Sequence, residues 1–298
     1  MLKSGWFRTG GHMAMALHRL RRNKAALLGA VIAIGYVFVA MFGPFLAPYN
    51  PYDMHLDQAL QSPSLAHPFG FDELGRDIFS RVIYGTRISF VISVVSVGIA
   101  MMIGVTLGTL SGYFGGAIDA IAMRGVDIMM AFPEILLALA IVSALRGGAQ
   151  VIGTETAISY LIIAVGLYSI PQFIRISRAS VMSVKQNEYV EAARATGEGT
   201  TGLILQYILP NALAPLIVQA TLRIGTAILT AAGLSFLGLG VQPPTPEWGS
   251  MTSYGRNYLR VAPYLATFPG LAIMLVVLGF NLFGDGLRDA LDPRLRLE

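Results

Sequence analysis

The most constraining feature of this sequence is a series of long stretches without Asp, Glu, Lys or Arg. These stretches cover residues 25–52, 88–118, 135–145, 156–174, 199–222, 224–246 and 261–284. Several exceed the roughly 20 residues that an α-helix needs to cross the hydrocarbon layer of a membrane. A helix on a soluble core also needs one polar face, which such stretches cannot provide. The sequence therefore predicts an all-α polytopic membrane protein.

The composition excludes several other classes of protein. Hydrophobic residues make up 54% of the chain and charged residues 13%, which is too apolar for a disordered chain, and there is no Cys for a disulfide scaffold. The net charge of +4 does not indicate nucleic-acid binding. Six basic residues precede the first apolar run with no acid among them, which is typical of a cytoplasmic N-terminus. They are Lys3, Arg8, Arg19, Arg21, Arg22 and Lys24. The alternative is a cleaved signal peptide, but the run 25–47 is too long for its apolar region.

Six membrane-spanning helices are expected. They lie near residues 25–47, 88–111, 121–145, 157–174, 211–238 and 264–284. The run 199–222 is not a separate span, because Pro210 and Pro215 interrupt it. Six spans place 14 of the 21 Lys and Arg residues inside and six outside, which favours an N-in/C-in topology. The resulting segments are a cytoplasmic tail at 1–24, the first span at 25–47, an extracytoplasmic segment at 48–87, a five-helix core at 88–284 and a cytoplasmic tail at 285–298.

Two further local patterns can be interpreted. In the outer segment, residues 78–83 have the pattern of an amphipathic helix, which we expect to lie along the outer membrane interface, with Asp77 and Arg81 paired across one turn. In the second span, four glycines follow one another at intervals of four residues, which indicates either close helix packing or, less favoured, a pore lining. They are Gly104, Gly108, Gly112 and Gly116.

The residue types that enzymes need are not arranged for chemistry. The four His residues all precede the second span and form no HExxH motif, and no Lys stands in the Gly-Lys-Ser/Thr order of a P-loop. We therefore expect no catalytic residues and no metal site in this chain. If ATP drives the protein, another subunit binds it.

The inner segment 174–210 contains a short helix with two distinct faces. Residues 187–196 read NEYVEAARAT and are followed by Gly197, a residue suited to a left-handed helix end. Glu188, Glu191 and Arg194 share a polar face, whereas Val190 and Ala193 share an apolar one. An acidic exposed face fits an anionic lipid leaflet poorly and favours a protein partner.

This segment resembles the EAA–G–LP loop of binding-protein-dependent ABC importer permeases. The matching residues are Glu191-Ala192-Ala193, Gly197 and Leu209-Pro210, although Tyr207 replaces the Ile that the family usually has. Three further stretches resemble the peptide/nickel branch of the family, C-type subunit, and the dipeptide and glutathione permeases in particular. They are FGFDELGRDIFSRVIYGTR at 69–87, LSFLGLGVQPPTPEWG at 234–249 and FNLFGDGLRDALDPR at 280–294.

The resemblance implies a fold, a function and a set of partners. The fold is the type I ABC importer permease fold, in the inner membrane of a bacterium. The function is passage of di- or oligopeptides, with glutathione, opines or nickel chelates as alternatives. The partners are a paralogous B-type permease subunit, two cytosolic ATPases that bind ATP and Mg, and an extracytoplasmic solute-binding protein. Residues of the coupling segment would dock on an ATPase: Asn187, Glu188, Tyr189, Glu191, Ala192, Ala193, Arg194, Gly197, Leu209 and Pro210. A secondary transporter is the alternative from another class, but its usual inverted repeats are not visible.

A few residues in or near the spans are candidates for further roles. Glu134 and Arg223 fall within spans, where charge is costly, so they either contact a peptide in the pathway or pair with each other. Pro133 and Pro171 interrupt the hydrogen-bond ladders of their spans and are expected to kink them, either as a hinge or, more favoured, as a fixed shape. Glu247 and Trp248, in the loop between the last two spans, are candidates for an interface anchor or for contact with the binding protein.

Overall fold

The computed structural model describes residues 20–148 and 153–291 and is helical almost throughout. The main elements are α2 (Lys24–Leu46), α3 (Ile78–Phe114), α4 (Gly116–Met130), α5 (Glu134–Arg146), α6 (Thr154–Lys185), α7 (Glu188–Ala195), α8 (Thr200–Gly202), a π-helix (Leu203–Ile208), α9 (Leu209–Phe236), α10 (Trp248–Gly255) and α11 (Tyr264–Leu291). Short 3₁₀ turns occur at Leu56–Gln58 and Arg256–Tyr258. Within the described ranges there is no strand, only an isolated bridge between Phe71 and Asp77.

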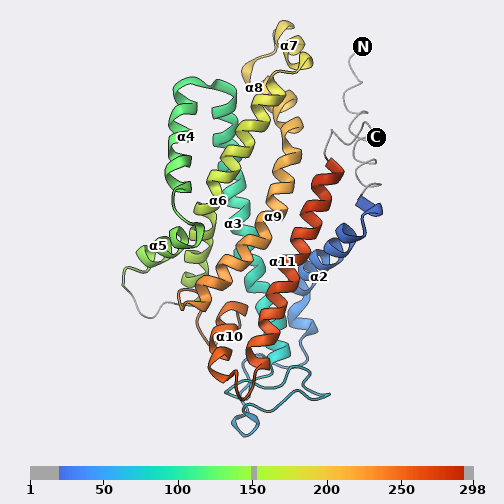
Figure 1. Cartoon of the computed structure of the whole chain (residues 1–298), viewed down its shortest axis with the longest axis vertical. Coiled ribbons are helices and arrows are strands. Elements are labelled where there is room, and N and C mark those ends of the chain that lie inside the picture. Colours follow the sequence, from blue (N-terminus) through green and yellow to red (C-terminus); the bar gives the residue numbers. More distant parts are fainter. Residues whose placement is uncertain (1–19, 149–152, 292–298) are drawn as a thin grey trace.

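Five of these helices are long and apolar enough to cross a membrane, and the bent pair of α4 and α5 makes six if it counts as one span. The prediction of an all-α polytopic membrane protein is therefore confirmed. The short helix α7 lies at one end of the molecule and the end of α11 points toward that end, whereas α10 lies near the opposite end with the segment between α2 and α3 (Figure 1). Most of the predicted tails 1–24 and 285–298 lies outside the described residues.

The second span begins earlier than predicted, and the separate interfacial helix at 78–83 was wrong. These residues form the first turns of α3, which runs without a break for 37 residues. Asp77 caps this helix by accepting a hydrogen bond from the backbone N–H of Ser80 at 2.7 Å. The expected pair of Asp77 with Arg81 is also wrong, because Asp77 contacts His67 Nδ1 at 2.9 Å.

The side chain of Arg81 is buried rather than interfacial. Its Nη1 donates to the carbonyl oxygens of Pro51 at 2.8 Å and Pro244 at 3.2 Å, and its Nε lies 3.5 Å from Asp72 Oδ2. Burial raises the free-energy cost of this charge, and these oxygens offset that cost because they take the place of water. The guanidinium thus joins three segments that are distant in the sequence.

The third predicted span is broken. Proline lacks an N–H and cannot continue the helical ladder, and the chain turns by 91° between α4 and α5 with Pro133 as the N-cap of α5. The kink predicted at Pro133 is therefore confirmed. The fifth span is longer than predicted. Its helix begins at Thr200, because α8, the π-helix and α9 form one helical stretch from Thr200 to Phe236.

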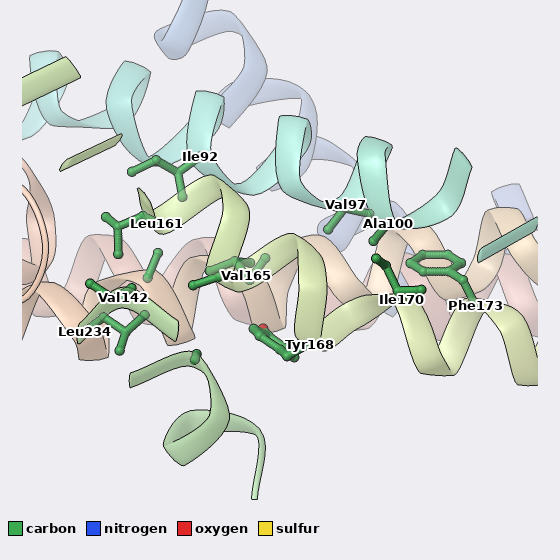
Figure 2. Packing of buried hydrophobic residues seen from close by; sticks show 14 of the residues in the cluster. Ile92, Val97, Ala100, Val142, Leu161, Val165, Tyr168, Ile170, Phe173 and Leu234 are labelled. Carbon is green, nitrogen blue, oxygen red and sulfur yellow. The ribbon is translucent and has the colours of Figure 1, made fainter. Parts of the chain in front are cut away.

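The core is centred on α6. The contact between α3 and α6 is the most extensive between any two elements of the described structure. Figure 2 shows Ile92, Val97 and Ala100 of α3 beside Leu161, Val165, Ile170 and Phe173 of α6.

Glycines permit this close approach of α3 and α6. A Cβ added to Gly108 would lie 2.5 Å from the carbonyl oxygen of Ile174, and one added to Gly112 would lie 2.8 Å from that of Arg178. Packing is therefore the role of Gly104, Gly108 and Gly112. Gly116 differs, since it starts α4 at φ +58° with open space around it.

Candidate functional site

The short helix α7 lies at the end of the molecule where α6 ends and α8 begins (Figure 1). Its apolar side is small: Val190 is 0% and Ala193 is 6% exposed. Both pack on a cluster contributed by α6, the π-helix and α9, which includes Val181, Leu203 and Ile208. The amphipathic pattern predicted for this helix is therefore confirmed.

The end of α7 is a Schellman cap. The backbone N–H of Glu198 donates to the carbonyl of Ala193 at 3.1 Å, and that of Gly197 donates to the carbonyl of Arg194 at 3.1 Å. This arrangement requires a left-handed residue, and Gly197 has φ +88°. The cap turns the chain sharply, so the following residues return to the bundle.

Most of the predicted coupling residues are on the surface. The exposed ones are Asn187, Glu188, Tyr189, Glu191, Ala192, Arg194, Gly197 and Pro210, whereas Leu209 is half-buried and Ala193 is buried. A single surface therefore carries acidic, aromatic and small side chains together. The buried Ala193 supports this surface from within the chain.

The α7 segment is tied to the bundle on both sides. On the α6 side, Lys185 Nζ donates to the carbonyl oxygen of Tyr113 at 2.6 Å, which joins the end of α6 to the end of α3. On the α9 side, the π-helix passes directly into the helix that contains Pro210, whose ring and missing N–H disturb the ladder before it. Asn211 Nδ2 donates to the carbonyl oxygen of Tyr207 at 2.7 Å and so satisfies a group in this irregular turn.

A second cluster of polar groups lies near the middle of α6 and α9. Arg223 forms two hydrogen bonds with Glu134, at 2.9 Å and 3.2 Å, so the pairing predicted as one of two alternatives is present. Arg223 Nε also donates to Gln172 Oε1 at 2.7 Å, and Gln219 Nε2 donates to the same oxygen at 2.9 Å. The guanidinium further lies 5.9 Å from the centroid of the Tyr168 ring.

The two members of the Glu134–Arg223 pair differ in exposure. The Arg223 side chain is 5% exposed and the Glu134 side chain is 44% exposed. A charge exposed at this depth is costly beside lipid, so the open side of Glu134 requires water or another protein. The sequence did not identify Gln172 or Gln219, although an uncharged polar residue within a span is the signal that would have pointed to them.

Glu247 and Trp248 lie inside the chain, at 1% and 2% exposed. The Glu247 carboxylate accepts hydrogen bonds from the backbone N–H groups of Gly249 at 2.9 Å and Ser250 at 2.8 Å, which caps α10. Trp248 Nε1 donates to the carbonyl oxygen of Val82 at 2.9 Å. These positions argue against the predicted direct contact with a binding protein. Burial raises the pKa of Glu247 above its usual range, although the two backbone N–H groups oppose the shift.

Among the residues that the structure describes, no group of three or more His, Asp or Glu side chains is arranged to hold a metal ion. The buried acids are used for ion pairs and helix caps instead. Asp72, for example, lies 2.6 Å from Arg76 Nε and accepts from its backbone N–H at 2.9 Å. These contacts make the outer end of the molecule a folded cap, which consists of residues 47–77 and α10.

Two family matches cover most of the chain. Residues 104–297 match the family described as binding-protein-dependent transport system inner membrane component. Residues 12–63 match the N-terminal TM domain of oligopeptide transport permease C. The first match agrees with the resemblance to ABC importer permeases, and the second with the resemblance to their peptide branch.

Similar proteins span nearly the whole chain. The dipeptide transport system permease protein DppC of Alkalihalophilus pseudofirmus is 46% identical over 94% of this chain and 90% of its own. The di/tripeptide permease protein DppC of Pseudomonas aeruginosa is 46% identical over 92% and 89%, and the glutathione permease protein GsiD of Pectobacterium atrosepticum is 44% identical over 93% and 90%.

A solved structure supports the fold. A chain of the inward-facing MetNI methionine ABC transporter matches with a TM-score of 0.54 at 20% identity, over 72% of this chain and 97% of that chain. The shared fold is that of a type I importer permease. With a family match over well over half of its length and relatives along nearly all of it, the chain belongs to the binding-protein-dependent transport system inner membrane components.

Proposed function

We propose that this chain, a permease subunit of a peptide ABC importer in the bacterial inner membrane, forms the C-type half of a pathway completed by a paralogous B-type subunit. It performs no catalysis itself. Two cytosolic ATPases bind ATP and Mg, and an extracytoplasmic solute-binding protein delivers the peptide to the outer end. Closure of the ATPases shifts the balance between inward and outward access.

The observation that supports this coupling most directly is the exposed surface of α7. The helix presents Glu188, Glu191 and Arg194 to solvent, while Val190 anchors it on the bundle. An eight-residue helix has little stability of its own in water, so the bundle holds it in place for a partner. The helices before and after it, α6 and the stretch that leads into α9, cross the membrane.

The orientation follows from the basic residues. The helix α7 lies at the end of the molecule toward which α11 runs, and the Lys and Arg bias predicts this end to be cytoplasmic (Figure 1). The segment 174–210 would then face the ATPases. The segment 48–87 would face the binding protein.

The pathway lies, in this proposal, beside the exposed side of Glu134. A free peptide carries an ammonium group at one end, which this carboxylate can accept in competition with Arg223. The half-exposed acid and the buried arginine suit such an exchange, because the arginine keeps its hydrogen bond to Gln172 when the acid turns away. Peptides are the substrates favoured by the names of the relatives, while glutathione, opines and nickel chelates remain alternatives.

Co-purification separates this proposal from a secondary transporter. An importer of this class forms a stable complex with ATPases that carry P-loops, whereas a secondary transporter runs without them. A chain that catalyses peptide uptake in vesicles without ATP would contradict the proposal.

The coupling role is tested by Glu191→Lys, which reverses one charge on the exposed face of α7. Charge reversal at a docked surface lowers association, whereas a solvated surface tolerates it. We expect normal membrane abundance but loss of the ATPase activity that the binding protein stimulates. The matched control is Glu155→Lys in the first turn of α6, at the opposite end of the molecule. Equal stimulation and uptake in both variants would remove α7 from the coupling mechanism.

A further inference from the structure

Helices α4 and α5 form an arm that stands beside the bundle (Figure 1). Apolar packing is sparse in α4, where only the buried Val126 and the partly buried Met123 belong to the core cluster. In α5 the buried Ala138 and Val142 are joined by three partly buried residues on the same core cluster: Leu137, Leu139 and Ile141. By contrast, α6 has buried residues along its whole length. The position of α4 therefore depends on other contacts more than that of α5 does.

Three polar contacts join the arm to one side of α6. Arg178 Nη2 donates to Asp119 Oδ2 at 2.6 Å, Arg175 Nη2 to Asp127 Oδ1 at 3.1 Å, and Gln172 Nε2 to Glu134 Oε1 at 3.1 Å. The partners on α6 are spaced by three residues and so share a face. Along the chain the acids follow the order Asp119, Asp127, Glu134, whereas their partners on α6 follow the reverse order, Arg178, Arg175, Gln172. The two segments therefore run antiparallel, and we call the three contacts the ladder and each contact a rung.

The rungs differ in strength. The outermost one toward the α7 end, Asp119–Arg178, has side chains 21% and 29% exposed, and both oxygens of the acid are bound. Ser111 Oγ donates to the same acid at 2.5 Å and adds α3 to the contact. The middle rung, Asp127–Arg175, is 65% and 51% exposed, so solvent screens it strongly. The Asp119–Arg178 rung therefore contributes most to the position of α4.

The third rung, Glu134–Gln172, also contacts α9. Glu134 and Gln172 both bind Arg223, and Gln172 also binds Gln219. The arm is thus joined by polar contacts to α6 at three levels, whereas in the described residues its polar contacts with α9 come only from α5, at Arg223 and just beyond the end of α9, where Arg146 Nη1 donates to the carbonyl oxygen of Gly238 at 3.2 Å. Since α6 and α9 are the helices on either side of the α7 segment, this difference decides which of them the arm follows.

We propose that the ladder makes the arm move with α6, so that displacement of α7 by an ATPase reaches Glu134 through Asp119 and Arg178 as positioning residues. This inference rests on the proposed function. Movement between α6 and α9 is then taken up at the contacts of α5 with α9, and among these at the contact of Glu134 with Arg223. The acid that faces the pathway would change its partner there when the coupling segment moves.

The test uses the assembled importer in vesicles with the variants Asp119→Asn and Arg178→Gln and the exchange of both charges, Asp119→Arg with Arg178→Asp. We expect each single variant to keep its membrane abundance and basal ATPase activity, while uptake per ATP hydrolysed falls about tenfold, as loss of a charged hydrogen bond would predict. The charge exchange should restore most of the loss. Glu155→Gln, an exposed acid on α6 outside the ladder, is the matched control and should not change the ratio.

A second measurement does not depend on uptake. The chain has no Cys, so spin labels can be placed at Ile121→Cys on α4 and Met182→Cys on α6, both exposed positions. The distance between the labels should stay constant between nucleotide-free and ATP-bound complexes, and should change with nucleotide in Asp119→Asn.

Two results would overturn the ladder. One is a distance between the labels that changes with ATP in the otherwise unmodified chain. The other is an unchanged amount of peptide imported per ATP in the assembled complexes of both single variants. In that case the Asp119–Arg178 pair would have a role in folding only. If the unmodified complex fails to import any peptide, the proposed function fails, and the label distance still decides whether α4 follows α6.

Discussion

Replacing Gly197 by serine should weaken docking of the ATPase without removing the protein from the membrane. Gly197 has φ +88° and no atom within 4 Å of the position that a Cβ would take. A side chain there meets no neighbour, so the only cost is backbone strain. The matched control is Gly199→Ser, two residues away, where φ is −72° and the space is equally open. Serine suits that position, because it is the N-cap of α8.

The magnitude follows from the contacts of α7. A left-handed conformation costs a residue other than glycine about 1–2 kcal/mol. Burial of Val190 stabilises the helix by only about 1.5–3 kcal/mol, so the strain removes much of what holds α7 in place. A loss of this size changes the equilibrium constant between the ordered and the displaced α7 by about 5- to 30-fold. At the unfavourable end, about a third of the molecules keep α7 ordered, so the apparent affinity falls by up to about threefold.

The assay is binding of the purified ATPase to the permease pair in nanodiscs, followed by titration of ATPase activity. We expect the affinity for the Gly197→Ser permease to fall by that factor and the affinity for Gly199→Ser to remain unchanged. Equal affinities would refute the argument that the cap orients the docking surface.

Three further predictions concern packing, topology and the pathway. Gly108→Ala should reduce thermal stability by about 1–3 kcal/mol through overpacking against α6, whereas Gly98→Ala, with open space on the same helix, should not; melting of the purified complex measures both. Single cysteines at Ser64 and Ser183, both exposed, should react differently with an impermeant thiol reagent in intact cells, and labelling of position 183 alone would invert the topology. Glu134→Gln should leave membrane abundance nearly unchanged, because the acid is half-exposed, but should reduce uptake of peptides with a free N-terminus more than that of blocked peptides; equal uptake of both would exclude the contact.

The presence and approximate places of the spans were predictable because membrane spans are the simplest pattern to detect. In lipid, a single run of uncharged residues can pair its backbone N–H and C=O groups within itself only as a helix. The start of α3 could not be found this way, since Arg81 looks like a surface residue until the carbonyls of Pro51 and Pro244 are seen around it. Those partners come from segments without any periodic pattern. The break at Pro133, in contrast, follows from the chemistry of one residue.

The candidate site was predictable to different degrees. The two faces of α7 follow from helical spacing, and Gly197 marks its end. Gln172 was missed because an amide in a span shows its role only through its neighbours, here Glu134 and Arg223. Glu247 was misinterpreted as a surface residue, since its partners are backbone N–H groups that no sequence pattern displays.

The outer cap also constrains the order in which the protein can be made. Arg81 binds the carbonyl of Pro244, Trp248 binds that of Val82, and Tyr264 Oη donates to the carbonyl of Leu60 at 2.7 Å. Each of these contacts joins an early part of the chain to a part that leaves the ribosome more than 160 residues later. The first two spans therefore enter the membrane with their outer polar groups still without these partners. A chain truncated directly after α9 would keep the spans up to α9, lose α11, and leave Val82, Leu60 and Arg81 without these partners.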